Sequence, residues 1–309
     1  MAENFSYSKL DLFKQCGFKY KLKYVDKHFL YDENISTALG HAIHSIEEDI
    51  ANTFIKDANA TIDYIALKNK FIIEAMKVRH KFPQDYVTPD KSGQTCEEKV
   101  KGYLDNGIYR LERQLRFNPG YKIIAAELPF EFDFYGAHFK GKIDRVIYDS
   151  VRNRYLIQDI KTYSVPVDRK DLTPIPLQFV VYVLAVEKLY NITAGQIHCQ
   201  YDLPFCDCIQ DTCLLCVGPS DLSAIEQLLD SIKQSLFIPN PGPLCHWCEF
   251  CPTNPGQPEG GKNLCPYYSL WTRENKTKAV AEQWQGLDRH AEVMANYLKK
   301  QQELIENVE

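Results

Sequence analysis

The sequence predicts an α/β fold, because helical patterns give way to strand patterns and then to an alternation of both. Ser6 is a good N-cap for a helix whose apolar stripe runs from Leu10 to Tyr24. Further helices are expected to start near Ser36 and to cover 62–79 and 97–115. Strand patterns rich in Ile, Val, Phe and Tyr then appear at 121–134, 138–148 and 154–161. Beyond them we expect a helix at 177–190, strands at 196–203 and around 206–217, and a helix at 219–236.

The composition is that of an ordinary globular chain with a sizeable core. Of the 309 residues, 45% are hydrophobic and 25% are charged. The net charge of −5 excludes an overall basic field, so any nucleic-acid site must be a local basic patch. The first residues show neither a basic nor an apolar leader segment, and the longest apolar run, 179–186, is too short to span a bilayer. We therefore expect a soluble, cytoplasmic protein with no membrane partner.

Residues 141–162, GKIDRVIYDSVRNRYLIQDIKT, predict a hairpin that carries charged groups. Side chains two apart on a strand share a face, so Asp159 and Lys161 lie together, and Asp144 joins them if the two strands pair. Carboxylate oxygens suit a hard divalent cation such as Mg²⁺, and a lysine beside it can orient or help to deprotonate water. An ordinary ion pair across a surface hairpin would use the same three residues.

Two helix faces carry further polar candidates. Gly40 and His44 are four residues apart, so His44 projects beside a point where glycine permits close approach of another backbone. A packed or exposed histidine without a ligand is the alternative. Gln178 and Tyr182 share one face of the helix at 177–190 in the same way, and a buried amphipathic helix with one polar residue would look alike.

The chain contains eleven cysteines, and nine of them lie between Cys199 and Cys265. Their odd number, the CxxC spacings and the expected reducing compartment argue against disulfides, so we interpret them as metal ligands. Four of them lie in a Gly/Pro-rich segment that could not bury a core of its own, so a metal would supply its stability: Cys245, Cys248, Cys251 and Cys265. Four local thiolates suit zinc, whereas a set completed from elsewhere in the chain suits an iron–sulfur cluster. An upstream set has spacings that zinc could use, but we favour small buried cysteines in a hairpin as its explanation: Cys206, Cys208, Cys213 and Cys216.

Five motifs in this order resemble the RecB-like branch of the PD-(D/E)XK nucleases, which includes the C-terminal nuclease domain of AddB and the CRISPR-associated RecB-like exonucleases. The motifs are SYSKLDLFKQCGFKYKLKYV, GHAIH, GKIDRV, QDIKT and LQFVVY, and the resemblance covers most of residues 5–266. It implies a restriction-endonuclease-like core, that is, a mixed central sheet flanked by helices. It also implies a metal-dependent nuclease that hydrolyses phosphodiester bonds.

The same resemblance implies a metal site. His44 of GHAIH, Asp144 of GKIDRV and Asp159 of QDIKT would hold Mg²⁺ or Mn²⁺, with the backbone carbonyl of Ile160 as a further ligand. Glu127, in the strand at 121–134, is an additional acidic candidate near this site.

The resemblance assigns the remaining catalytic roles to three side chains beside the carboxylates. Lys161 would be the catalytic lysine, which positions the attacking hydroxide and stabilises charge in the transition state. Gln178 would orient the lysine or the water, and Tyr182 would contact the substrate.

In the iron–sulfur members of this branch, one cysteine precedes the nuclease core and three follow it, so that a [4Fe-4S] cluster clamps the N-terminal helix to the C-terminal cysteine segment. Cys16, Cys245 and Cys248 match this pattern. The family's usual gap places the last ligand between Cys251, which is too close, and Cys265, which is too far. We favour Cys265, with the intervening residues as an insertion, and Cys251 remains the alternative.

The resulting division of the chain has four segments: a helical part at 1–120, a nuclease core at 121–238, a cluster segment at 239–266 and a helical extension at 267–309. The expected activity is that of an exonuclease on single-stranded DNA or DNA ends, in recombination, repair or replication. A helicase or a recombinase is the kind of partner that such a nuclease works beside. The alternative is a non-catalytic, metal- or cluster-stabilised DNA-binding or scaffold subunit of a recombination complex.

Overall fold

The computed structural model describes residues 4–28, 33–90, 92–168, 175–212, 217–251, 264–265 and 267. The chain forms two compact units, one of residues 1–7 and 33–224, the other of residues 8–32 and 225–309. Residues 33–120 and 121–224, which the sequence analysis separates, thus lie in one unit, and the division by function stays a prediction. The expected C-terminal helices fall, beyond Tyr267, outside the described residues, as do Cys213 and Cys216.

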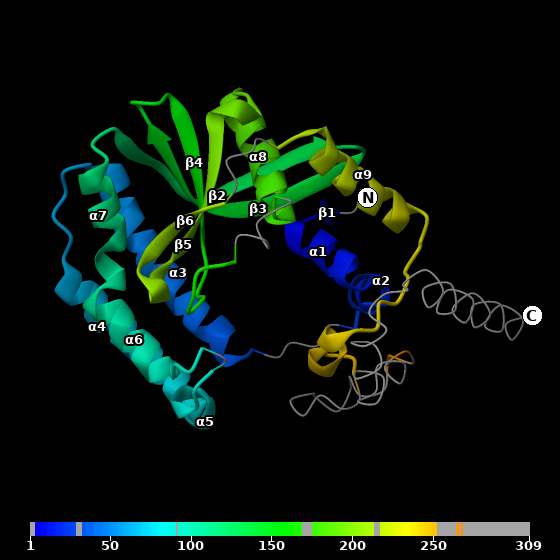
Figure 1. The fold of residues 1–309 in the computed structure, drawn as a ribbon, viewed down its shortest axis with the longest axis horizontal. Coiled ribbons are helices and arrows are strands. Elements are labelled where there is room, and N and C mark those ends of the chain that lie inside the picture. Colours follow the sequence, from blue (N-terminus) through cyan, green and yellow to red (C-terminus); the bar gives the residue numbers. More distant parts are fainter. Residues whose placement is uncertain are drawn as a thin grey trace, which may run out of the picture. The chain divides into compact units, whose positions relative to one another are not determined.

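A mixed six-stranded sheet forms the centre of the first unit (Figure 1). Its strands are β1 (Asn4–Phe5), β2 (Tyr121–Phe134), β3 (Ala137–Asp149), β4 (Arg154–Ile160), β5 (Ile197–Leu203) and β6 (Cys208–Asp211). The order is β1-β3-β4-β5-β6, and β2 pairs with β3. The pairs β2–β3, β3–β4 and β5–β6 are antiparallel, whereas β1–β3 and β4–β5 are parallel. The predicted hairpin and the mixed sheet are confirmed.

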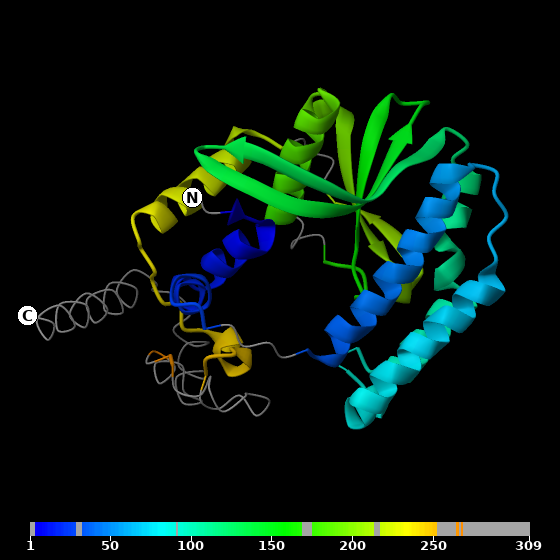
Figure 2. The ribbon, with the colours of Figure 1, turned by 180° about the vertical axis from the view of Figure 1, so that it is seen from behind.

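Helices cover both sides of this sheet (Figures 1 and 2). On one side lie α3 (Ile35–Lys56), α4 (Tyr64–Lys81), α5 (Pro83–Val87), α6 (Cys96–Asp105) and α7 (Arg110–Phe117), and on the other lies α8 (Leu177–Tyr190). The first turn of α3 is capped by Asn34, whose side chain accepts from Thr37 N, so the helix begins just before the expected Ser36. Among the described residues, none of the helices combines the length and apolar character that crossing a bilayer requires.

The two faces of β4 pack against different helices. Leu156 and Ile160 belong to the apolar core formed with α3, α4 and α6. Tyr155, on the other face, stacks on Tyr190 of α8, with ring centroids 5.2 Å apart. Because β4 is covered on both faces, its burial is nearly continuous, as expected for an interior strand.

One expected helix is interrupted. The segment 97–115 forms α6 and α7, joined by a 3₁₀ turn at Gly107–Tyr109. A Cβ at Gly107 would stand 2.4 Å from the backbone oxygen of Pro204, so only glycine allows this close approach. The interruption therefore arises from tertiary packing, and local spacing did not predict it. Within the described part of the strand expected around 206–217, the strand residues are Cys208–Asp211.

The N-terminal helix is broken as well. It consists of α1 (Tyr7–Gln15), α2 (Gly17–Tyr20) and a π-helical turn at Lys21–Val25. Cys16 between them is extended, with φ −164° and ψ 110°. A Cβ at Gly17 would lie 2.8 Å from Ile238 N, within the same unit, so the chain bends here to bring two backbones together. Helix α9 (Pro219–Lys233) starts in the first unit and continues from residue 225 into the second, which also contains a 3₁₀ turn at Pro243–Trp247.

Candidate active site

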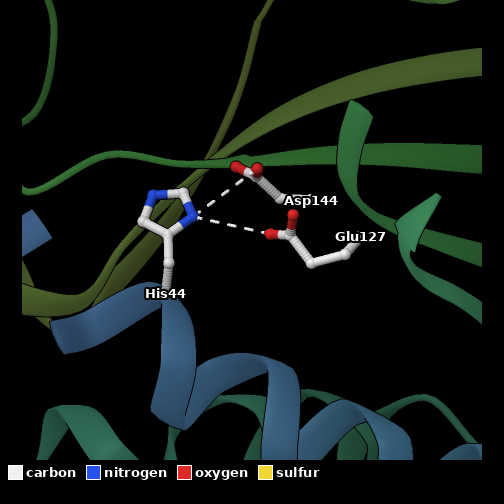
Figure 3. A group of neighbouring side chains, drawn as sticks. All are labelled: His44, Glu127 and Asp144. Atoms are coloured by element: carbon white, nitrogen blue, oxygen red, sulfur yellow. Dashed lines mark ion pairs between the residues drawn. The ribbon is translucent and has the colours of Figure 1, made fainter. Parts of the chain in front are cut away.

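Three side chains from three elements converge at one place (Figure 3). His44 on α3 directs Nδ1 towards Asp144 on β3 and Glu127 on β2, at 3.5 Å from Asp144 Oδ1 and 3.9 Å from Glu127 Oε1. One ligand atom from each residue lies within 4.8 Å of the other two. The three side chains are 13–32% exposed, so the group is open to solvent on one side.

The peptide groups of Ile160 connect this group to β4. The backbone N–H of Ile160 donates to Asp144 Oδ2 at 2.7 Å. The carbonyl oxygen of Ile160 lies 3.1 Å from His44 Nε2. One residue of β4 therefore fixes both the carboxylate from β3 and the imidazole from α3, and the residues on either side of it, Asp159 and Lys161, carry the next set of polar groups.

Asp159 is the centre of that second set. Its Oδ2 forms an ion pair with Lys161 Nζ at 2.7 Å, and its Oδ1 accepts from the side-chain amide of Gln178. The same Gln178 nitrogen donates to the hydroxyl oxygen of Tyr182 at 2.8 Å. Both Gln178 and Tyr182 come from α8, so the predicted shared helix face is present and lies over the carboxyl end of β4.

Burial and mutual repulsion shift the titration of the acidic groups. Burial raises the pKa of Asp159 to about 6, and Asp144 adds to this shift. Burial also raises the pKa of Asp144, against the opposing effect of His44. For His44 burial favours the neutral ring, but the surrounding carboxylates outweigh it and raise its pKa. A site in which carboxylates resist ionisation until a cation is near is typical of a metal centre.

Lys161 and Tyr182 keep their protons. Burial opposes the charge on Lys161, but the carboxylate of Asp159 outweighs it and raises the lysine pKa. Burial, followed by the charge of Asp159, raises the pKa of Tyr182 above its ordinary range. Near neutral pH the site therefore holds an ammonium donor and a phenol, and neither is a ready base.

Glu127 has a more central position than its sequence suggested. It adopts a left-handed backbone conformation with φ 47°, which costs free energy for a residue with a side chain. The ladder between β2 and β3 pairs Ala126 with Arg145 and Leu128 with Ile143, so Glu127 stands opposite Asp144 without joining the ladder. The sequence signal was an acidic residue within the otherwise apolar stretch 123–130, two positions before Pro129.

The donor set fits a hard divalent cation. Two carboxylates and an imidazole converge, and oxygen and imidazole ligands of this kind suit Mg²⁺ or Mn²⁺. The group with convergent ligand atoms consists of His44, Asp144 and Glu127, and the role of the first two as metal ligands stays a prediction. Asp159 contacts Lys161 and Gln178 beside this group, and its predicted role as a ligand stays a prediction, as does that of the Ile160 carbonyl.

Four cysteines of the predicted cluster lie near one another in the second unit. Cys16, Cys248 and Cys265 pack against an apolar group of Phe18, Leu22, Phe250 and Tyr267. The backbone N–H groups of Asn240 and Gly242 approach Cys16 Sγ at 3.5 Å and Cys245 Sγ at 3.3 Å. Burial, with added repulsion from neighbouring thiols that include Cys16 and Cys245, raises the pKa of Cys248 to about 11 and of Cys265 to about 12.

The upstream cysteines are described only in part. Cys206 donates to the backbone oxygen of Tyr163 at 3.1 Å and interacts with Cys208. Burial, with Cys208, raises the pKa of Cys206 to about 11, as expected of a packed thiol. Whether Cys206 and Cys208 bind a metal with Cys213 and Cys216 stays open, because the latter two lie outside the described residues.

The comparison with protein families decides the identity of this arrangement. The sequence profile of the PD-(D/E)XK nuclease superfamily matches residues 4–253, which include both polar groups described above. The chain belongs to the PD-(D/E)XK nuclease superfamily. In this PD-(D/E)XK nuclease the matched region carries Asp144 within β3, Asp159 near the end of β4 and Lys161 directly after it. No curated protein matches the chain.

Two solved structures are similar to the PD-(D/E)XK nuclease. One is a candidate exonuclease from Eubacterium rectale, with 13% identity, a TM-score of 0.42 and coverage of 76% of this chain and 80% of that chain. The other is a protein named SSO0001, with 16% identity, a TM-score of 0.29 and coverage of 77% of this chain and 95% of that chain.

Proposed function

We propose that this nuclease hydrolyses phosphodiester bonds of DNA with the help of Mg²⁺ or Mn²⁺. One observation carries the proposal: Ile160 binds Asp144 through its N–H and lies beside His44 through its carbonyl, while its neighbours Asp159 and Lys161 form an ion pair. The candidate metal ligands and a partly buried ammonium thereby lie within a few residues of one strand. This is the donor arrangement that stabilisation of a charged phosphoryl group requires.

In the proposed site, His44, Asp144 and Asp159 hold the cation, with Glu127 and the Ile160 carbonyl as further ligands. When bound, the cation supplies Lewis-acid polarisation of a phosphate oxygen and lowers the pKa of water. The raised pKa values of Asp144 and Asp159 support this role, because two carboxylates that repel each other gain most from a shared cation.

Lys161 acts as an ammonium. Its proton is retained through Asp159, so it donates a hydrogen bond to the attacking water or to a phosphate oxygen and stabilises the charge that develops there. Gln178 orients the carboxylate of Asp159 and so the lysine, and Tyr182 contacts the substrate as a neutral phenol.

The proposed substrate is single-stranded DNA or a DNA end, and the proposed mode is that of an exonuclease in recombination, repair or replication beside a helicase or recombinase. The support for this part is the resemblance of the five sequence motifs to the RecB-like branch. A scaffold role remains the competing outcome, and the cleavage assay below separates the two.

The direct test of the site is Asp144→Ala, with Asp133→Ala as its control. Both are aspartates in β2 or β3, but the side chain of Asp133 is 82% exposed. We expect Asp144→Ala to lose cleavage of an end-labelled oligonucleotide in Mn²⁺ and to keep its circular dichroism spectrum. Retained cleavage in Asp144→Ala would refute the site, and an uncut oligonucleotide with excess wild-type protein would favour the scaffold role.

We also propose a [4Fe-4S] cluster on Cys16, Cys245, Cys248 and Cys265. The thiol of Cys265 lies near those of Cys16, Cys245 and Cys248, and that of Cys251 lies near Cys245. The preference for Cys265 as the fourth ligand therefore rests on the family pattern, and Cys251 is the alternative.

Iron, sulfide and zinc analysis of anaerobically purified protein tests the cluster. We expect a brown protein with iron and sulfide, and we expect Cys265→Ser to lose the iron. Cys251, which is 1% exposed, serves as the control, because Cys251→Ser should disturb packing and keep the iron. A colourless protein that contains zinc would refute the cluster and leave the nuclease site to be judged by cleavage alone.

A further inference from the structure

Four charged side chains lie buried next to the candidate active site and take no part in its proposed chemistry. They are Glu47 on α3, Arg110 on α7, Arg145 on β3 and Asp202 on β5, and none is more than 3% exposed. Arg145 donates from Nη1 to Asp202 at 2.8 Å and from Nη2 to Glu47 at 3.1 Å. Arg110 Nη2 lies 3.3 Å from Glu47 Oε2, and Arg110 Nε donates to Asp202. We call these four residues the buried charge network.

The network is balanced in formal charge. Two guanidinium groups face two carboxylates, and each carboxylate contacts both arginines. Burial opposes the charge of Asp202, but Arg110 and Arg145 outweigh it and lower its pKa. Tyr103 adds a hydrogen bond to Glu47 at 3.0 Å, and Gln158 accepts from Arg145 at 2.8 Å.

Members of the network are adjacent to active-site residues. Arg145 follows Asp144 on β3, and its partner Gln158 precedes Asp159 on β4. These contacts place the network on the side of β4 that faces α3, whereas Asp159 faces Gln178 of α8.

The two carboxylates of the network, Glu47 and Asp202, lie close along the chain or through a hydrogen bond to His44 and Lys161. Glu47 lies three residues after His44, on the next turn of α3. The backbone oxygen of Asp202 accepts the N–H of Lys161 at 2.9 Å. The network thus adjoins four residues of the proposed site, each through one neighbouring residue: His44, Asp144, Asp159 and Lys161.

Stability alone does not explain such a network. Buried ion pairs cost desolvation, and apolar groups of the same volume often give a more stable protein. Among the residues that the structure describes, Arg145 Nε is a buried donor without a hydrogen-bond partner. The hydrogen-bonding groups of the network are therefore not all used. What it does provide is a fixed relative placement of α3, β3, β4 and β5.

We propose that the buried charge network positions the metal ligands, and that Glu47 in particular holds His44 in place against Asp144. The proposal rests on the proposed metal-dependent function. Glu47 is a positioning residue, since it contacts neither cation nor substrate. Supporting groups behind metal ligands typically affect metal affinity by about 10–100-fold.

The test measures Mn²⁺ binding directly, by calorimetry and by the electron paramagnetic resonance of free Mn²⁺, alongside cleavage and thermal unfolding. Three variants are compared. Glu47→Gln removes the ion pair between Arg145 and α3 and leaves the network with a net positive charge. The double variant Glu47→Gln, Arg110→Gln removes the same ion pair and restores the net charge of the network to zero. Ile50→Val, one turn further along α3 and 0% exposed, disturbs the same core without any charge.

We expect both variants with Glu47→Gln to bind Mn²⁺ about 10-fold or more weakly and to show a lower kcat with little change in the KM for DNA. The double variant should unfold at a higher temperature than the single one, so it decides the matter if the single variant does not fold. Ile50→Val should lower the unfolding temperature and bind Mn²⁺ like the wild type.

Two results would overturn the proposal: Mn²⁺ affinity within twofold of wild type in the Glu47 variants, or affinity that returns to the wild-type value once neutrality is restored. Either result would show that the network stabilises the fold without affecting the metal ligands. Failure of the proposed function looks different, because the wild-type protein itself would then neither bind Mn²⁺ nor cut DNA.

Discussion

Lys161 Nζ lies 2.7 Å from Oδ2 of Asp159, a residue that is only 1% exposed, at the end of β4. Only Ile160, the last residue of β4, separates the two partners along the chain. Each partner stabilises the charged form of the other against burial, so the protonation states of both depend on the pair.

We expect Mn²⁺ binding to weaken as the pH falls through about 6. The pKa of Asp159 is raised to about 6, so below that pH a proton competes with the cation, and above it the carboxylate is free to bind. Calorimetric titrations of Mn²⁺ between pH 5 and pH 8 would measure this, and affinity that does not change with pH would contradict it.

Lys161→Met should lower kcat by about 10²–10³-fold, the usual effect of removing one donor from a charge-stabilising site. Loss of the ammonium also removes what opposes the raised pKa of Asp159, so the pH at which Mn²⁺ binding rises should move upwards. Lys140→Met is the control, because that lysine pairs only with the exposed Glu131. A variant that cleaves like the wild type would exclude a catalytic lysine here.

Glu127→Gln should weaken Mn²⁺ binding by several-fold, because it removes one negative charge from the group with His44 and Asp144. The matched control is Glu131→Gln on the same strand, whose side chain is 67% exposed. Glu127→Gly should relieve the left-handed conformation, stabilise the fold by about 1 kcal/mol and still weaken Mn²⁺ binding. Equal affinity in the Glu127 and Glu131 variants would exclude Glu127 from the metal site.

Gly17→Ala should destabilise the protein by about 1–3 kcal/mol, because the added Cβ would meet backbone atoms of Ile238 at 2.8 and 2.9 Å. Gly102→Ala offers the opposite case. Nothing lies within 4 Å of a Cβ there, and alanine in the exposed helix α6 should stabilise by about 0.5–1 kcal/mol. Urea unfolding of both variants measures the difference, and two variants of equal stability would show that Ile238 moves aside freely.

Asp149→Asn should lower the free energy of unfolding by about 1–2 kcal/mol at pH 7. Burial opposes ionisation of Asp149, but hydrogen bonds from Arg152 and Arg154 outweigh it and lower its pKa below the ordinary 3.8. The contribution of Asp149 is therefore complete above that value and is lost as the pH falls below it. Unfolding of wild type and variant should differ less at pH 3 than at pH 7, and a constant difference would contradict this.

Much of the candidate site could be predicted from sequence because its residues are local. Asp144, Asp159 and Lys161 lie on two strands joined by a short turn, and antiparallel pairing of β3 with β4 brings them together directly. The spacing of Gln178 and Tyr182 similarly fixes a shared helix face. The family match then gave this hairpin its chemical meaning, which the spacing alone left open.

The interruptions of helices could not be predicted in this way. Apolar spacing continues through Cys16 and through the turn at Gly107–Tyr109, so the local pattern is that of one helix in each case. What breaks the helices is a close approach of distant backbone, at Ile238 and at Pro204, each of which only glycine admits. The apolar spacing along one segment does not reveal which distant segment packs against it.

The position of Glu127 and the buried charges also depend on long-range register. Glu127 meets His44 only because β2 shifts its pairing along β3 and takes a left-handed residue opposite Asp144. Glu47 and Asp202 both contact Arg145 because α3 and β5 pack beside it in the fold. The sequence around each carboxylate does not predict these contacts.

The parallel pairing of β4 with β5 governs when a growing chain can acquire activity. β4 is an inner strand, and its partner β5 comes only after the crossover through α8. Pairings of this kind have high contact order and form late. Until the ribosome has released residue 202, Lys161 lacks the carbonyl that holds its backbone and Arg145 lacks a carboxylate. A nascent chain is therefore expected to leave nearby messenger RNA and DNA uncut, since the site is completed only after most of the nuclease region has been translated.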